Sequence, residues 1–390
     1  MIRRTFRDIL PTQIGPMSRS PESANFVVQY ANPDKGFVST CQPASLFENH
    51  VVPDFTIAEE LTLVTDYKEL KKQGLSGVLH IVFRGSLTGL SVEDSIPQSM
   101  KSEGFYDQLH IFTPNDLLHP RFRTYLDTHP DYSISIEKNG TISAEIEKRL
   151  SNALKNRVGI ILGGGPGHPE DSVYKPVIYA LNNTAKNGTP IAGICLGQQL
   201  LGTMLHAMGK SEQVQEGIYE LGSQVESITQ EGKNHLLFKA FGDSIVVVHV
   251  NEFHWNPNNL PDTTILTRNA RGEPSAITFP LDSSGQAITW QGHPEFPMKG
   301  NEHERTFEVE GKKITIPEGI SPAYAGMVQF FVGSENRFRQ FKDIYKMTRE
   351  DLQNLVDARR LPAHPGKTFY GRIFQHFSNK RLYPERMANS

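Results

Sequence analysis

The sequence has little cysteine and no long hydrophobic run. Only two of its 390 residues are cysteine, Cys41 and Cys195, which excludes a disulfide framework and predicts a reducing, cytoplasmic setting. No run of 18 apolar residues occurs, so we expect no membrane span. Pro11 and Gln13 interrupt any apolar core of a secretion signal. Cys41 lies among turn-forming residues, and we expect it to be a bystander.

The formal charge of -3 favours no particular class of partner, but the charge is unevenly distributed. Residues 337–390 contain 12 Lys/Arg and 5 Asp/Glu, a net charge of +7. A basic tail can bind an acidic partner or RNA, but a solvated basic helical face is the better explanation of it. We therefore expect no nucleic-acid partner.

Strand-like and helical patterns alternate between residues 77 and 300. This alternation predicts an α/β fold with an open, mostly parallel sheet flanked by helices. The predicted strands lie at 78–83, 109–112, 133–136, 158–162, 190–194, 225–228, 244–250, 264–267 and 287–290. The predicted helices lie at 144–154 and 196–208.

Two flanking regions differ in composition from this central part. Residues 1–76 are rich in polar residues and proline and contain one helical pattern, at 57–72, so we expect an N-terminal cap. Residues 301–390 form the expected C-terminal extension. The predicted elements of this extension are a hairpin at 307–316 and helices at 337–346 and 349–360. The expected main domain is residues 77–300.

Cys195 stands where a predicted strand turns sharply into a helix. Gly193 and Gly197 flank it in the pattern G-x-C-x-G, the nucleophile-elbow geometry usually written with serine. The free N–H groups of the following helix would favour the reactive thiolate. The alternative is a buried structural cysteine on a tight turn.

A glycine-rich loop, 163–167, follows the predicted strand 158–162. His168-Pro169-Glu170 follows this loop, which excludes a P-loop, and the dinucleotide pattern G-x-G-x-x-G also fails at His168. A bare backbone N–H of the loop could form half of an oxyanion hole at the ligand-binding edge of the sheet. The alternative is a simple turn.

His293 and Glu295 follow the predicted strand 287–290. Imidazole can take a thiol proton, and a carboxylate can hold its other ring nitrogen. Pro294 stiffens the pair, and two side chains two residues apart in an extended chain leave on the same face. Cysteine, histidine and glutamate can converge only if the sheet folds as predicted.

These three motifs, in this order, resemble the class I glutamine amidotransferase domain. Cys195 lies 30 residues after Gly165 and 98 before His293, spacings similar to those of that family. The resemblance covers roughly residues 77–300. It implies a flavodoxin-like fold, with N- and C-terminal extensions outside the family's domain.

The resemblance also implies roles for individual residues. Cys195 resembles the nucleophile, His293 the general base and Glu295 its orienting acid. The implied chemistry is a thioester intermediate, loss of ammonia and hydrolysis to glutamate. Gly165 and Leu196 match the positions whose backbone N–H groups form the oxyanion hole. The resemblance implies no metal and no cofactor.

The substrate-facing positions depart from the family pattern. Gln199 matches the glutamine that lies against the substrate amide, but Gln198 replaces the usual histidine before it. In the family, one strand helps hold the α-amino and α-carboxylate groups of glutamine. The matching candidates here are Asn251, Phe253, His254 and Trp255. Phe253 or Trp255 stands where serine is common.

Three functions are consistent with these patterns. The first is a glutaminase that feeds ammonia to a separate synthetase or acceptor protein. The second is a γ-glutamyl hydrolase or transferase acting on a conjugate, which the altered α-group positions favour. The third is a regulatory binding module that keeps the fold without catalysis, against which the complete Cys-His-Glu set argues. The small-molecule substrate is glutamine or a γ-glutamyl compound in the first two.

Overall fold

The computed structural model describes residues 37–39, 55–84, 92–93, 95–118, 120–165, 167–257, 260–281, 285–295, 305–309, 312–316 and 366–383. Its central sheet contains eight strands, named here from one edge to the other. They are β4 (Ser133–Ser135), β3 (Tyr106–Phe112), β2 (Val78–Phe83), β5 (Ile160–Leu162), β6 (Ile191–Ile194), β12 (Gln286–Trp290), β11 (Ala276–Pro280) and β9 (Thr264–Ile265).

The order of the sheet identifies its topology. The six strands from β4 to β12 are parallel, and β11 and β9 extend that sheet with antiparallel pairing. Without the edge strand β4, the parallel strands β3-β2-β5-β6-β12 run 2-1-3-4-5 along the chain, the flavodoxin-like order, and β4 adds one more parallel strand beside β3. The predicted fold class is therefore confirmed.

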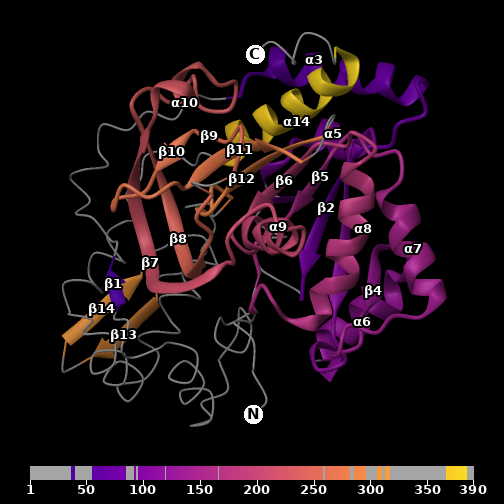
Figure 1. Cartoon of the computed structure of the whole chain (residues 1–390), viewed down its shortest axis with the longest axis horizontal. Coiled ribbons are helices and arrows are strands. Elements are labelled where there is room, and N and C mark those ends of the chain that lie inside the picture. The colour runs from indigo at the N-terminus through magenta and orange to yellow at the C-terminus, as the bar shows by residue number, and fades with distance from the viewer. Residues whose placement is uncertain are drawn as a thin grey trace.

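Helices cover both faces of this sheet (Figure 1). They are α3 (Ile57–Lys72), α5 (Gln98–Ser102), α6 (Pro120–Thr128), α7 (Ala144–Leu154), α8 (Lys175–Ala185), α9 (Leu196–Ala207), α10 (Gln230–Asn234) and α14 (Gly366–Leu382). Three short 3-10 turns lie at Asp116–Leu118, Pro130–Tyr132 and Ser172–Tyr174. None of the described helices is both long and apolar enough to cross a bilayer.

The helices predicted at 57–72 and 144–154 begin and end as expected, and polar caps explain where they start. Thr56 forms a capping box with Glu59, and Ser143 accepts a hydrogen bond from the Ile146 N–H group. Each cap satisfies backbone N–H groups that have no partner within the helix.

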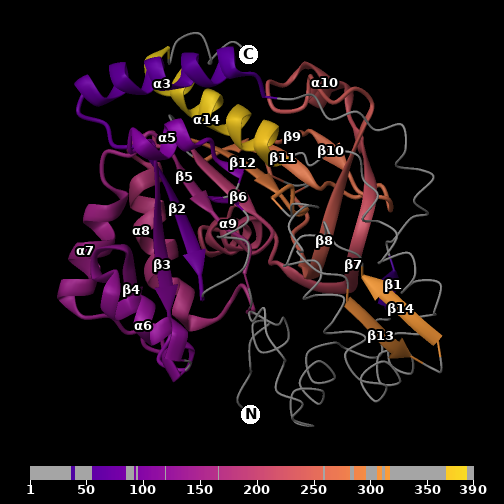
Figure 2. The same ribbon diagram turned by 180° about the vertical axis from the view of Figure 1, so that it is seen from behind.

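The hydrophobic core lies in two layers, one on each face of the sheet. Alternate residues of β5 enter different layers: Ile161 enters one, and Ile160 and Leu162 enter the other. Helices α3, α5 and α14 contribute to the layer of Ile161, whereas α7, α8 and α9 contribute to the opposite layer. Figure 2 shows α3 and α14 side by side, as they are in Figure 1.

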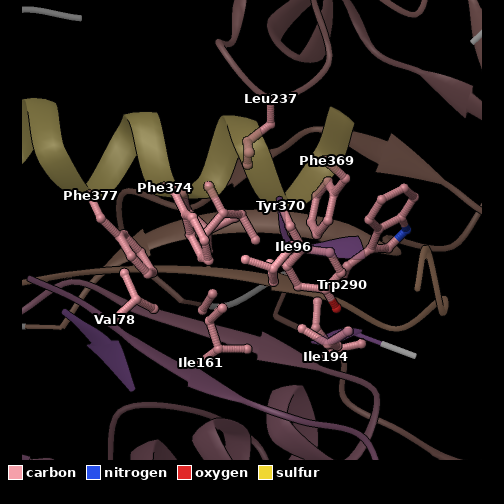
Figure 3. Close-up of a cluster of buried hydrophobic side chains, with 14 of the residues drawn as sticks. Val78, Ile96, Ile161, Ile194, Leu237, Trp290, Phe369, Tyr370, Phe374 and Phe377 are labelled. Atoms are coloured by element: carbon pink, nitrogen blue, oxygen red, sulfur yellow. The ribbon is translucent and has the colours of Figure 1, made fainter. Parts of the chain in front are cut away.

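Helix α14 is the largest aromatic contributor to its layer. Figure 3 shows its aromatic side chains directed toward the sheet. The contributing residues, all at most 1% exposed, are Phe369, Tyr370, Phe374 and Phe377. Trp290 of β12 packs against the ring of Phe369, with ring centroids 4.7 Å apart. Aromatic pairs of this kind add to the stabilisation that burial alone provides.

The sequence did not predict α14, and the helices predicted at 337–346 and 349–360 lie outside the described residues. Cys41 also lies outside them. The domain boundaries at residues 76 and 300 stay a prediction. Helix α3 precedes the first boundary and α14 follows the second, yet both complete the core of the central sheet.

A second sheet stands beside the first (Figure 1). Its strands are β7 (Gln215–Ile228), β8 (Ser244–His254), β10 (Thr267–Arg268) and β1 (Phe37–Ser39). The long pair of β7 and β8 is antiparallel and extends well beyond the strands predicted at 225–228 and 244–250. The predicted hairpin is confirmed as β13 (Arg305–Val309) and β14 (Lys312–Ile316).

Candidate functional site

Three neighbouring parallel strands bring the sequence motifs to one edge of the central sheet. Strand β6 pairs in parallel with β5 on one side and with β12 on the other. The glycine loop follows β5, Cys195 follows β6, and His293 follows β12. Ligands bind at this carboxyl edge in open α/β sheets. The topology therefore brings together the groups that the sequence predicted to converge.

Cys195 occupies a strained corner between β6 and α9. Its φ and ψ are 50° and -109°, in a region that side-chain-bearing residues rarely adopt. The Cys195 N–H group donates to the Trp290 carbonyl at 2.8 Å. A Cβ on Gly197 would lie 2.2 Å from the Leu162 carbonyl oxygen, and one on Gly193 would lie 2.8 Å from Gly197. Glycine on both sides thus permits the tight corner that presents the thiol.

His293 and Glu295 form a buried hydrogen-bonded pair. Nδ1 of His293 lies 2.8 Å from Oε1 of Glu295, and the two residues are 4% and 0% exposed. Burial by itself lowers the pKa of His293. The charges of Cys195 and Glu295, and hydrogen bonds to both side chains, outweigh burial and raise this pKa to about 10. The arrangement favours the charged imidazolium form of His293. The backbone N–H group of His293 donates to the Val248 carbonyl at 2.8 Å, which anchors the pair to β8.

Tyr370 of α14 supports this pair from behind. Its hydroxyl donates to Oε2 of Glu295 at 3.4 Å, so each oxygen of the carboxylate has its own partner. Burial, together with the charge of Glu295, raises the pKa of Tyr370 well above its ordinary value, which keeps the phenol protonated as a donor. Sequence analysis missed Tyr370, because no motif marks it and it lies 75 residues from Glu295.

The two expected oxyanion-hole residues lie next to each other. Leu196 is the first residue of α9, where N–H groups have no acceptor within the helix. A Cβ on Gly165 would lie 3.5 Å from Cδ2 of Leu196 and 3.1 Å from Cβ of Phe83. The glycine loop is therefore packed against the start of α9, beside Cys195.

Gln199 and Phe253 connect α9 with the end of β8. The Gln199 amide donates to the Phe253 carbonyl at 2.8 Å and to Oε1 of Gln291 at 3.3 Å. The Phe253 ring meets His168 edge to face, with centroids 4.5 Å apart. Since His168 follows the glycine loop, this contact joins two of the segments around Cys195.

Gln198, where the family usually has histidine, is buried and hydrogen-bonded to other parts of the protein. Its amide donates to the Ser275 carbonyl and to the Thr289 hydroxyl, both at 3.0 Å. These bonds join α9 to the segment before β11 and to β12. Gln198 therefore ties the nucleophile helix to the sheet.

Three predicted substrate-binding residues have other partners in the structure. The Asn251 amide donates to Oε2 of Glu220 at 3.0 Å and lies 3.2 Å from Nε2 of His254. Arg271 lies 3.1 Å from the other oxygen of Glu220, and together these residues form a charged cluster on β7 and β8. Trp255 is 4% exposed and packs edge to face against Phe279. The role of Asn251, His254 and Trp255 in substrate binding stays a prediction.

A buried carboxylate, Glu226, lies behind the Cys195 corner. It is 0% exposed and accepts four hydrogen bonds. Its donors, at 2.5 to 2.9 Å, are His249, Ser275, Thr267 and Trp290. Burial lowers the pKa of His249, but hydrogen bonds to Glu220 and Glu226 raise it to about 9. His249 and Glu226 therefore form a buried ion pair. Glu226 also holds Trp290 in place, and the Trp290 carbonyl accepts the Cys195 N–H group.

Metal chemistry has no evident ligand set here. Among the residues that the structure describes, no three His, Cys, Asp or Glu side chains lie together as metal ligands would. The site is therefore built from a thiol, an imidazole and a carboxylate, the groups that nucleophilic catalysis at an acyl carbon requires.

Parts of this chain are similar to known proteins. Residues 128–309 match the family model described as glutamine amidotransferase class-I. Carbamoyl phosphate synthase small chains of Haemophilus ducreyi and Pasteurella multocida are 30% and 32% identical over 141 residues, 36% of this chain and 32% of each relative. The chain thus matches about a third of the length of these curated relatives. The solved glutaminase domain of Trypanosoma brucei CTPS with bound acivicin is 18% identical and covers 57% of this chain and 87% of its own, with a TM-score of 0.36.

Proposed function

Because this chain carries a class-I glutamine amidotransferase domain at residues 128–309, we propose that it hydrolyses the side-chain amide of glutamine and supplies ammonia to a separate acceptor enzyme. The observation that carries the proposal is the buried His293–Glu295 pair beside Cys195 at the ends of adjacent strands. A thiol, an imidazole and an orienting carboxylate in this arrangement are suited to acyl transfer.

The first half-reaction forms a thioester. The Cys195 thiolate attacks the amide carbon, and the carbonyl oxygen becomes an oxyanion that accepts hydrogen bonds from the backbone N–H groups of Gly165 and Leu196. The C–N bond then breaks as the imidazolium of His293 gives its proton to the nitrogen. Ammonia leaves, and the glutamyl group remains on the sulfur of Cys195.

The second half-reaction restores the enzyme. A water molecule attacks the thioester carbon while neutral His293 accepts its proton. The C–S bond breaks, glutamate leaves, and Cys195 returns as a thiolate beside the imidazolium. Glu295 holds the imidazole orientation and stabilises its charge throughout the cycle.

A partner chain is supported by the names of the relatives. Each is the small chain of a synthase, so the name itself implies a larger companion chain. We propose that the ammonia formed here is likewise consumed by a separate synthetase. A γ-glutamyl conjugate is the second candidate substrate, favoured by the altered α-group positions, where Phe253 or Trp255 stands in place of serine.

The substrate test is ammonia and glutamate release from L-glutamine, compared with a panel of γ-glutamyl amides. Turnover of free glutamine supports the ammonia-supplying function. Turnover of conjugates alone would replace it with a γ-glutamyl hydrolase. No turnover of either class, together with no labelling of Cys195 by a thiol-reactive glutamine analogue, would indicate a binding module.

The raised pKa of His293 predicts an alkaline limit to activity. The imidazolium must protonate the leaving nitrogen, so kcat/KM is expected to fall as the pH rises through about 10. Glu295→Gln removes a charge that raises this pKa. The alkaline fall in kcat/KM should therefore move toward neutral pH by about 1–3 pH units. A pH profile of kcat/KM for both proteins checks this. A wild-type limb near the ordinary value of 6.5 would contradict it.

The same shift has a consequence for stability. The pKa of His293 is higher in the folded state than its ordinary value of 6.5. The imidazolium therefore contributes stability that is complete below about pH 6.5 and is lost as the pH rises through about 10. Chemical unfolding at several pH values, compared with His293→Gln, isolates this contribution.

Tyr370→Phe tests the support that α14 gives to Glu295. The hydroxyl touches the carboxylate and not the substrate, so kcat should fall about two- to tenfold with KM unchanged. Steady-state kinetics measure kcat and KM separately. Tyr179→Phe, at a position 64% exposed on α8, is the control. A lower melting temperature with unchanged kcat would mean that the Tyr370 hydroxyl is only structural.

A further inference from the structure

A cavity lies away from the Cys195 site, between α10, α14 and the strands β9, β11 and β12. Its volume is about 610 Å³. Gln286 lines it at the start of β12, whereas His293 follows the end of that strand. Figure 1 shows α10 and α14 close to β9 and β11 at this end of the molecule. The cavity is thus separate from the candidate catalytic edge.

The lining is rich in cations and hydrogen-bond donors. Lys239 and Lys380 bring ammonium groups, and His235 and His376 bring imidazoles whose ring centroids lie 5.8 Å apart. The other polar lining residues are Asn234, Thr264, Thr278, Gln286, Asn379 and the carboxylate-bearing Glu231. Two ammonium groups therefore face one carboxylate.

Hydrogen bonding fixes which atoms remain available to a ligand. The Leu237 N–H group donates to Nδ1 of His235 at 3.4 Å, so a neutral His235 carries its proton on Nε2. Nε2 of His376 lies 3.2 Å from Oε1 of Gln286. Because Oε1 of Gln286 is an acceptor, Nε2 of His376 carries the proton and its buried Nδ1 is an acceptor, so His376 offers an anion no donor. The donors open to a ligand are therefore His235, Lys239 and Lys380.

The two lysines also have no ion-pair partner within the described residues. Within the described ranges, neither Lys239 nor Lys380 forms an ion pair, whereas Lys233 on α10 pairs with Asp243 at 2.5 Å. Burial, aided by the charge of Lys380, lowers the pKa of His235 to about 4. Burial, with the charges of His235 and Lys380, lowers that of His376 to about 3. The two imidazoles are therefore neutral near neutral pH, and an anion would offset the charges of Lys239 and Lys380.

We propose that this cavity binds a small anion bearing phosphate or carboxylate groups. The ammonium groups of Lys239 and Lys380 bind its charged oxygens, and the Nε2–H group of His235 donates to it. Charge-assisted hydrogen bonds of this kind are stronger than neutral ones. This inference is independent of the proposed glutaminase activity.

Isothermal titration calorimetry with two probes tests the site and distinguishes the ligand chemistry. Pyrophosphate represents phosphate ligands and citrate represents polycarboxylates, each at constant ionic strength. We expect one of them to bind with a Kd of about 1 mM or tighter. Lys239→Met and Lys380→Met should each weaken binding about tenfold, because each removes one charge-assisted contact while keeping most of the side-chain stem.

Lys233→Met is the matched control, because Lys233 is on α10 beside the cavity but is paired with Asp243 and does not line the cavity. Its affinity should equal that of the wild type. Histidine NMR provides a second readout, since a bound anion should raise the pKa values of His235 and His376. Failure of both probes to bind below about 10 mM would overturn the proposal. Equal weakening by Lys233→Met would also overturn it, because binding would then reflect general surface charge.

Discussion

Cys195→Ala is expected to lower kcat/KM for the amide substrate by at least about 10⁴-fold. The covalent step has no other thiol at this corner, and water attacks amides far more slowly than a thiolate does. Alanine fits the strained corner between Gly193 and Gly197 as a smaller side chain, so the melting temperature should change little. Ammonia release and thermal unfolding of the same preparations measure the two effects.

Cys195→Ser is the companion variant, because it keeps the shape of the side chain and replaces the sulfur. It should be nearly as inactive as the alanine variant, since His293 is arranged to stabilise a thiolate. A wild-type rate in either variant would refute the role of Cys195 as nucleophile. Activity could also be lost because a variant unfolds. Substrate binding by the variant distinguishes loss of the nucleophile from loss of the fold.

Glu226→Gln is expected to lower the free energy of unfolding by about 3–5 kcal/mol. The amide has a single acceptor oxygen, so two of the four donors around Glu226 lose their acceptor and face an NH₂ group. The imidazolium of His249 also loses a buried counter-charge. Urea unfolding monitored by tryptophan fluorescence suits this variant, because Trp290 donates to Glu226.

The loss of stability in Glu226→Gln should depend on pH, and this dependence identifies its cause. His249 has a folded-state pKa of about 9, above its ordinary 6.5. Its charged form therefore stabilises the fold fully below about pH 6.5 and ceases to do so as the pH rises through about 9. The difference between wild type and Glu226→Gln should shrink over this interval. Glu137→Gln, at an exposed position, should change stability by less than about 0.5 kcal/mol, and an equal effect at both positions would contradict the assignment.

The sequence predicted the central fold and the converging motifs because both depend on local patterns. The runs at 78–83 and 287–290 are apolar over strand lengths, and Thr56 and Ser143 mark helix starts. Once the strands are parallel, the residues after β5, β6 and β12 must share an edge. The position of Cys195 at that edge follows from strand order alone.

Partners distant in the chain were not predictable in this way. Tyr370 reaches Glu295 only because α14 packs on the sheet, and α14 was missed although Phe369, Ile373 and Phe377 recur at helical spacing. The carboxylate of Glu226 would be expected at a surface, yet donors from four other strands or their flanks bury it. Such networks depend on tertiary packing, which no short stretch of sequence records.

The position of α14 in the chain also constrains how the protein is made. Domains fold during synthesis as their segments leave the ribosome, N-terminal parts first. Residues 366–382 supply Phe369, Tyr370, Phe374 and Phe377 to one layer of the core, so that face of the sheet stays only partly covered in a nascent chain until this helix emerges. The partner of Glu295 on α14 arrives at the same time. Translation therefore delivers the supporting hydroxyl of the site after the residues it supports, and an incomplete chain exposes an apolar surface that chaperones recognise.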